Sequence, residues 1–463
     1  MQSWLRLQEH LGDANRMKTP IVDFVADYAN NPNKLRLHMP GHKGTNVIGM
    51  EQNDITEIPG ADSLYEANGI IAQSEENASN IFNARTFYST EGSSLCIRAM
   101  LYLALVNNSI KGERPWILVG RNAHKTFLSA AALLDFDIRW LYPKKEESYL
   151  SCQVSFDEVE RILADAKSKP VAVYITSPDY LGNRVDIEAI ARVCHKHGVL
   201  LLVDNAHGAY LKFLPESEHP MDLGADMCCD SAHKTLPALT GAAYLHIGMH
   251  MPDEYASQAK NALALFGSTS PSYLILQSLD AVNKYLMGDY KEQLHVFMKQ
   301  VTDVKNSLIA SGYELIGNEP LKITINVKPY GYTGYELAEL LSTKDIVCEF
   351  ADPDYLVLMF TPEITEAGLK QIEDALLNVS MGKPVEKETL QFQEQEQIMS
   401  VREAMFSLSE ALPVELCEGR VLSAATVGCP PAVPIAICGE RLDANTIECF
   451  KYYGIKTCFV VKE

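Results

Sequence analysis

The chain has 463 residues, of which 47% are hydrophobic and 22% charged, and its formal net charge is −20. The length allows two or three domains, while the acidic balance and the lack of a basic run argue against nucleic-acid binding. The sequence contains no run of 18 apolar residues, so no membrane span is predicted. Its eleven cysteines are scattered and form no C-x-x-C pair, which predicts free thiols in the cytoplasm.

From about residue 75 to 250 the chain alternates amphipathic helices with short apolar strands. Helices are expected at 75–84, 95–106, 125–134, 157–167 and 187–197. Strands are expected at 116–120, 138–142, 171–176, 199–203 and 227–229. This alternation predicts an α/β fold with a mostly parallel sheet that is covered by helices on both faces. In such sheets the ligand lies at the carboxyl ends of the strands.

The second half of the chain predicts smaller units. A long helical region, 272–311, is followed by two strands and two helices between residues 312 and 380. We expect a large N-terminal domain to span 1–311, a small α/β domain 312–380, and a linker with a C-terminal subdomain 381–463.

Two polar residues follow neighbouring expected strands. Asp204 ends the strand at 199–203, and Lys234 lies in the Ser-Ala-His-Lys run after the strand at 227–229. This pair suits pyridoxal 5'-phosphate (PLP), because a lysine forms the Schiff base with its aldehyde and an aspartate keeps its pyridine nitrogen protonated.

A phosphate site is expected where Gly92, Ser93 and Ser94 precede an expected helix, since backbone N–H groups and hydroxyls there attract anions. The alternative is an ordinary helix cap. His124 could stack on a pyridine ring or be a loop histidine that bonds to the backbone. Ser231 could bind phosphate and His233 could stack or relay protons, or both could be satisfied strand-end residues.

Cysteine and histidine also gather at 194–197, and we interpret this run as the polar end of a helix rather than a metal site.

Several motifs now resemble the PLP-dependent Orn/Lys/Arg decarboxylase family, in the same order and across about 38–440. They are HMPGHKG at 38–44, TEIPGADSL at 56–64, EGSS at 91–94, RNAHKT at 121–126, DNAHGA at 204–209, SAHKTL at 231–236, STSPSY at 268–273 and CPPAVPIAICGE at 429–440. The resemblance implies a fold-type-I, aspartate-aminotransferase-like large domain with smaller C-terminal α/β domains.

The resemblance also implies roles for individual residues. Lys234 would carry the cofactor and Asp204 would pair with the pyridine nitrogen, while His124 would stack on the ring. The remaining cofactor contacts would come from the phosphate-binding Gly92, Ser93, Ser94 and Ser231, the ring-lining His207 and His233, and a partner subunit's Thr269 or Ser270. A homodimer or higher homo-oligomer with shared active sites is therefore expected. Catalysis would rest on Lys234, His233 and His124.

The chain departs from the family pattern in places: it resembles a short form without the N-terminal wing domain, and EGSS and CPPAVP replace more common motifs. The expected activity is decarboxylation of arginine, lysine or ornithine to a polyamine-pathway amine. Among these three substrates, the short form slightly favours arginine. An aminotransferase would usually need an arginine clamp, and residues 312–380 contain no arginine. A non-catalytic PLP-fold protein is the other alternative. The cationic end of the substrate needs carboxylates. We expect the acids in plausible loops to be solvated, with contact to the substrate as the alternative; they are Asp62, Glu349, Asp352, Asp354 and Glu440.

Overall fold

The computed structural model describes residues 17–108, 113–143, 148–386, 394–425 and 432–463. Half of the expected linker and the first three residues of the CPPAVP motif lie outside the described residues. The chain divides into two compact units: Met1–Asn108 with Leu200–His295, and Ser109–Val199 with Val296–Glu463. The expected domain boundaries near residues 311 and 380 stay predictions.

A seven-stranded sheet runs in the order β1-β7-β6-β5-β4-β2-β3. Its strands are β1 (Ala84–Ser89), β2 (Trp116–Gly120), β3 (Asp137–Leu141), β4 (Ala172–Thr176), β5 (Leu200–Asp204), β6 (Met227–Asp230) and β7 (Ala243–Gly248). β5 pairs with β6 in parallel, and so does β2 with β3 and with β4, whereas β7 runs antiparallel to both β1 and β6. The sheet is therefore mostly parallel, as the alternation of helices and strands predicts.

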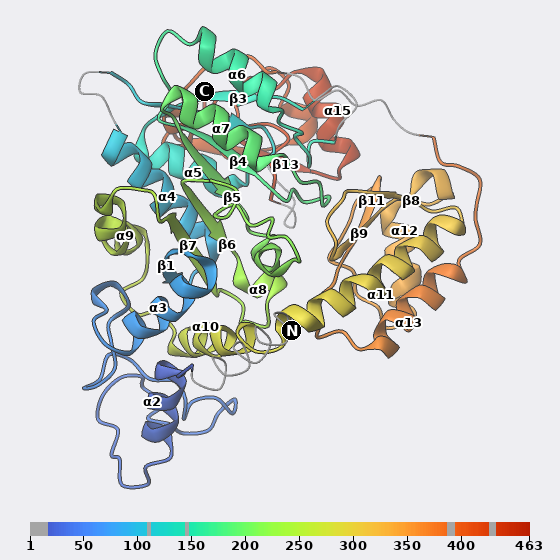
Figure 1. The fold of residues 1–463 in the computed structure, drawn as a ribbon. Helices are drawn as coiled ribbons and strands as arrows, with labels where there is room; N and C mark the ends of the chain where they lie inside the picture. Colours follow the sequence, from blue (N-terminus) through green and yellow to red (C-terminus); the bar gives the residue numbers. More distant parts are fainter. Residues whose placement is uncertain (1–16, 109–112, 144–147, 387–393, 426–431) are drawn as a thin grey trace. The chain divides into compact units, whose positions relative to one another are not determined.

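In the first unit, helices cover strands that are buried along almost their whole length. The helices are α2 (Pro20–Ala29), η1 (Leu64–Glu66), α3 (Ile70–Phe82), α4 (Gly92–Asn108), η2 (Ala209–Phe213), α8 (Ala232–Thr235), α9 (Asp253–Phe266) and α10 (Tyr273–Leu286). α4 packs against β1, β5, β6 and β7 (Figure 1). All residues of β6 and β7 are buried, which explains why these strands are continuous apolar runs rather than alternating ones.

The second unit contains the helices that do not belong to the first unit, together with two smaller sheets. Its sheets have the orders β10-β11-β9-β8 and β12-β13. The strands are β8 (Glu314–Ile316), β9 (Lys322–Asn326), β10 (Phe350–Ala351), β11 (Tyr355–Met359), β12 (Ser409–Pro413) and β13 (Thr457–Val461). The helices are α5 (Lys125–Leu134), α6 (Phe156–Asp165), α7 (Ile187–His197), η3 (Lys328–Tyr330), α12 (Gly334–Ser342), α13 (Glu366–Leu377), α14 (Val401–Met405), η4 (Val414–Leu416) and α15 (Ala444–Tyr452). α11 (Tyr290–Ala310) begins in the first unit and continues into the second.

Most expected helices and strands are confirmed to within a few residues. The helix expected at 75–84 is misplaced, because α3 spans Ile70–Phe82 and Ala84 already begins β1. Asn83 separates the two elements with a left-handed backbone, φ 53°, which ends the helix abruptly. α7 does end in the basic turn His195–His197, with Gly198 as its left-handed C-cap. The polar helix end expected at 194–197 is thus confirmed.

The N-terminal helix α2 is held by a buried carboxylate. Asp280 of α10 is fully buried, and its Oδ2 accepts hydrogen bonds from the backbone N–H groups of Ile21 and Val22 at 2.9 and 3.0 Å. Its Oδ1 accepts a bond from the Ser74 hydroxyl at 2.5 Å. Burial outweighs these bonds and raises the pKa of Asp280 to about 6.

We expect Asp280→Ala to destabilise the protein by about 2–4 kcal/mol, since three donors lose their acceptor. Asp280→Asn keeps an acceptor for α2 and cannot ionise. Because the folded pKa lies above the ordinary value of 3.8, the stabilising contribution of Asp280 is present below about pH 4 and is lost as the pH rises through about 6. Melting temperatures at pH 4 and pH 7 should therefore shift in favour of Asp280→Asn at the higher pH. A constant difference would contradict this assignment.

Candidate active site

The candidate site is built on the carboxyl ends of two paired strands. β5 ends at Asp204 and β6 ends at Asp230, and the parallel register places Asp204 beside Cys229. Because parallel neighbours end at the same edge of a sheet, Asp204 and the Ser231–Lys234 segment emerge side by side. The expectation that the aspartate and the lysine follow neighbouring strands is therefore confirmed.

Lys234 lies in α8, the single helical turn that follows β6. Its Nζ is 3.1 Å from Nε2 of His207, which belongs to the turn after β5. His207 is buried, whereas Lys234 is half-buried. The imidazole can accept a hydrogen bond from the amine at this distance, so the reactive nitrogen has a fixed direction before any ligand binds.

Asp204 is almost completely buried, with 2% of its surface exposed. Its Oδ1 accepts a hydrogen bond from the backbone N–H of Ala206 at 3.2 Å and lies 3.7 Å from the Cys229 thiol. A carboxylate in such surroundings interacts strongly with a cationic ring nitrogen, because little water screens the pair.

Two serines meet at the start of α4. Ser231 donates its hydroxyl hydrogen to Ser93 Oγ at 2.8 Å, and Ser94 follows in the first helical turn. Gly92 has φ 70° and its N–H bonds to the carbonyl of Gly241 at 2.8 Å. A Cβ on Gly92 would meet no atom within 4 Å, so open space lies above this turn. Hydroxyls, a helix N-terminus and free space together fit a phosphate group.

His233 is oriented by its backbone surroundings. Nδ1 lies 2.9 Å from the carbonyl oxygen of Ala242, which requires Nδ1 to carry a proton and donate it. Burial lowers the pKa of His233, and the charge of the adjacent Lys234 acts in the same direction. A neutral His233 keeps a lone pair on Nε2, with which it can accept a proton.

The loop with Thr269 and Ser270 is exposed and is fixed at its start. Ser268 donates its backbone N–H to Glu91 Oε1 at 2.6 Å, directly before Gly92. Sequence reasoning did not single out Glu91. Its position directly before the Gly-Ser-Ser turn could have indicated that Glu91 contributes to this part of the site.

His124 belongs to the second unit and caps α5. Its Nδ1 accepts a hydrogen bond from the backbone N–H of Thr126 at 3.2 Å and lies 2.9 Å from the Thr126 hydroxyl. This is the backbone-bonded loop histidine that the sequence left open as an alternative. Stacking on a pyridine ring stays a prediction for His124.

The acids considered for the cationic end of a substrate are mostly not solvated. Four of the five are buried: Asp62, Asp352, Asp354 and Glu440. Glu440 lies 3.7 Å from Arg121, and Asp354 lies 3.0 Å from Lys328 and accepts a bond from Tyr452 at 2.7 Å. The expectation of solvated acids is thus wrong for these four, because internal donors replace water.

The residues at this edge of the sheet fit PLP. An amine, a buried carboxylate and a hydroxyl pair at a helix N-terminus correspond to the aldehyde, the ring nitrogen and the phosphate. The carboxyl ends of β5 and β6 and the start of α4 thus offer each group that the cofactor requires, from residues of one unit.

Comparison with known proteins agrees with this fit. The serine palmitoyltransferase of Sphingomonas wittichii superposes with a TM-score of 0.54 at 14% identity, covering 77% of this chain and 82% of that one. Lysine decarboxylase A from Pseudomonas aeruginosa superposes with a TM-score of 0.77 at 18% identity, covering 97% and 81%. The fold is that of the fold-type-I PLP-dependent enzymes.

A narrower assignment follows from the sequence match. Residues 19–324 match the major domain of the Orn/Lys/Arg decarboxylases, and an arginine decarboxylase from Bacillus anthracis is 26% identical over 471 residues, covering 94% of this chain and 92% of the relative. The chain belongs to the Orn/Lys/Arg decarboxylase family, and it is an amino-acid carboxy-lyase with PLP as its cofactor.

Two further sequence expectations can be compared with the structure. Among the residues it describes, no helix combines the length and the apolar character needed to cross a bilayer. The ten cysteines within the described ranges are all free thiols, as expected.

Lys234→Ala should abolish the visible absorbance of the lysine-bound cofactor and all turnover, because the substitution removes the amine Nζ that lies 3.1 Å from His207. Lys299→Ala, in the exposed face of α11, serves as the matched control and should retain both. Absorbance spectra and product formation measure the outcome. Retained absorbance in Lys234→Ala would contradict the assignment of this lysine.

Ser231→Ala should weaken binding of PLP by about tenfold or more, because a hydrogen bond to an anion is lost. Ser257→Ala, on exposed α9, should leave the dissociation constant unchanged. Titration of the cofactor-free protein by fluorescence gives both constants. Equal constants would remove Ser231 from the phosphate site.

Proposed function

We propose that the protein removes the α-carboxylate of a basic L-amino acid, and that arginine is the substrate. The observation that carries the proposal is the 3.1 Å contact between Lys234 Nζ and His207 Nε2, in segments that directly follow the paired strands β6 and β5. Asp204 is the last residue of β5. Similarity to an arginine decarboxylase along 94% of the chain, at 26% identity, supports arginine over lysine and ornithine.

Each residue of the site has a defined task in this proposal. Lys234 would hold the cofactor through Nζ, Asp204 would keep the pyridine nitrogen protonated, and the serines would bind the phosphate. When bound, PLP supplies an electron sink for the electron pair that the departing carboxylate leaves behind. His207 would orient the Lys234 amine, from which it is 3.1 Å away.

The carboxylate that leaves as CO2 must be replaced by a proton at the substrate's α-carbon. Lys234 Nζ and His233 Nε2 are the candidate donors, because both groups lie in α8 beside the site. The lowered pKa of His233 favours its neutral form, so Lys234 is the stronger candidate near pH 7.

An aminotransferase is the nearest alternative, since it would share the fold and the cofactor. It would usually hold the α-carboxylate with a bidentate arginine, and residues 312–380 supply none. A decarboxylase has no need for such a clamp, since it must release the carboxylate as CO2. A non-catalytic role would leave the joint placement of Lys234, Asp204 and the serines unexplained.

The deciding assay supplies PLP-loaded protein with arginine, lysine and ornithine separately and measures amine and CO2. Arginine should give the highest kcat/KM, and Lys234→Ala protein is the negative control. A parallel reaction with a keto-acid acceptor tests amino transfer. Amine from lysine or ornithine alone would overturn the substrate assignment, while amino transfer without CO2 would overturn the reaction.

We also propose a homodimer with shared sites. Thr269 and Ser270 are exposed on the chain and would reach a partner's phosphate. Lys234→Ala subunits and Thr269→Ala/Ser270→Ala subunits should be inactive alone and should recover activity when mixed, because each hybrid dimer then has one intact site. Subunit exchange must be shown by mass. Exchange without recovery would contradict the shared site.

The cellular setting is proposed from chemistry. Free thiols at the ten described cysteines suit a reducing cytoplasm, and the amine formed from arginine would enter polyamine synthesis.

A further inference from the structure

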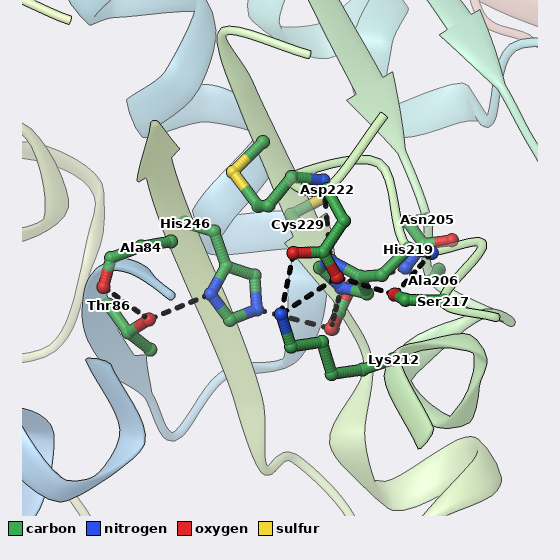
Figure 2. A network of polar contacts seen from close by, with 12 residues as sticks. Ala84, Thr86, Asn205, Ala206, Lys212, Ser217, His219, Asp222, Cys229 and His246 are labelled. Atoms are coloured by element: carbon green, nitrogen blue, oxygen red, sulfur yellow. Dashed lines mark hydrogen bonds and ion pairs between the residues drawn. The ribbon is translucent and has the colours of Figure 1, made fainter. Parts of the chain in front are cut away.

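A second polar cluster lies within the first unit. Its Asn205 belongs to the DNAHGA motif at 204–209, whereas its other members were not singled out in the sequence. Asp230, His219, His246 and Asn205 are all completely buried. Asp230 Oδ2 lies 3.0 Å from His219 Nε2 and 3.1 Å from His246 Nε2, and Oδ1 accepts a bond from Asn205 Nδ2 at 2.7 Å (Figure 2). One carboxylate thus receives three N–H donors from three different parts of the chain.

The outer nitrogens of the two histidines determine where their protons lie. His219 Nδ1 accepts a hydrogen bond from the backbone N–H of Met221 at 3.4 Å, so its proton is on Nε2 and points to Asp230. His246 Nδ1 lies 2.9 Å from the Thr86 hydroxyl, which can donate to it. Both rings can therefore be neutral and both can donate to Asp230.

The carboxylate is held in its charged form. Burial alone would raise the pKa of Asp230, but the two histidines lower it well below its ordinary range. Burial lowers the pKa of His246, whereas its contact with Asp230 acts in the opposite direction. Together with Cys228, the carboxylate and the two histidines are also close enough to one another to hold a metal ion, which is an alternative role for the cluster.

Asp230 cannot touch the cofactor itself. Side chains alternate along a strand, and Asp204 pairs in register with Cys229, so Asp230 points to the opposite face of the sheet. Its contact with the site runs through Asn205, the residue directly after Asp204.

Asn205 is fixed through its backbone and its amide nitrogen. Its backbone N–H bonds to Cys229 O at 3.0 Å, and its carbonyl accepts a bond from Gly208 N at 2.8 Å. A Cβ on Gly208 would lie 2.0 Å from Asn205 Oδ1, so only glycine leaves room for this amide. The turn 204–208 therefore depends on the position of the Asn205 side chain.

The loop that carries His219 is anchored as well. Asp222 accepts hydrogen bonds from Lys212 Nζ at 2.7 Å to each carboxylate oxygen, and Ser217 also bonds to Asp222 (Figure 2). The backbone N–H of Asp222 bonds to His219 O at 2.9 Å. His219 is thus held in place before it contacts Asp230.

We propose that His219, Asp230 and His246 form a clamp that positions the turn 204–208, and with it Asp204 and His207, for the cofactor. This inference rests on the proposed function, because it assigns the clamp to the same site. The three clamp residues are positioning residues, since they act through Asn205 and touch neither cofactor nor substrate.

The primary test compares Asp230→Asn with Asp226→Asn. Asp226 is a matched control, because it is also a buried aspartate and directly precedes the first residue of β6, whereas Asp230 is the last. It accepts a bond from Leu201 N at 2.6 Å and pairs with His250 at 2.9 Å. Asp230→Asn should bind PLP at least about tenfold more weakly than wild type and alter the pH titration of its visible absorbance. Asp226→Asn should melt at a lower temperature but retain both properties.

A double-mutant cycle tests the route through Asn205. Asn205→Ala leaves Asp230 paired with both histidines and so serves even if Asp230→Asn fails to fold. Both single variants should weaken PLP binding. The dissociation constant of the double variant should not exceed that of the single variant that binds PLP more weakly. Additive losses would overturn the proposed route.

Two other outcomes would overturn the clamp itself. One is a PLP dissociation constant for folded Asp230→Asn or Asn205→Ala equal to that of wild type. The other is a stoichiometric transition metal in the purified wild-type protein that Asp230→Asn loses, which would make the cluster a metal site. Because affinity for PLP is measured without substrate, the clamp can fail while decarboxylation stands, and the substrate assignment can fail while the clamp stands.

Discussion

The parallel pairing of β5 with β6 is the constraint on which the rest of the site depends. These two strands are separated by more than twenty residues of chain, yet their register brings Asp204 next to Cys229 and directs the following segments to one edge. Lys234, Asp204 and Ser231 all take their positions from this pair. A shift by one residue would turn Asp204 to the opposite face and separate it from Lys234.

Buried charge is the main cost of this arrangement, and the chain offsets it with N–H donors. Asp204 and Asp230 lie at the ends of adjacent strands but on opposite faces, which keeps the two carboxylates from one another's hydrogen-bond partners. Asp204 is left with a partner set that includes the Ala206 N–H, whereas Asp230 has three N–H donors. A protein interior tolerates ionised carboxylates when they are bonded in this way.

The second unit uses the same principle to tie its C-terminal segment to the strand β2. Arg121, directly after β2, donates from its two terminal nitrogens to the carbonyls of Pro434 and Ile435, both at 2.9 Å. The N–H of Lys125 bonds to the carbonyl of Ala432 at 2.9 Å. The described part of the motif at 429–440 thus has a structural role at these residues, through its backbone carbonyls.

The sequence by itself determined the local elements and the chemistry. Short, continuously apolar runs such as 116–120 and 199–203 predict strands, because strands of a parallel sheet are buried on both faces. The Asp-Asn-Ala-His and Ser-Ala-His-Lys motifs identify a family. Only the tertiary structure decided which polar groups meet. The pairing of Lys234 with His207, the bond between Ser231 and Ser93, and the burial of Asp230 between His219 and His246 join residues far apart in the chain. Such contacts depend on strand order and register, which local patterns of hydrophobicity do not encode, because each pattern reports only the face that a residue presents and not the residue that it faces.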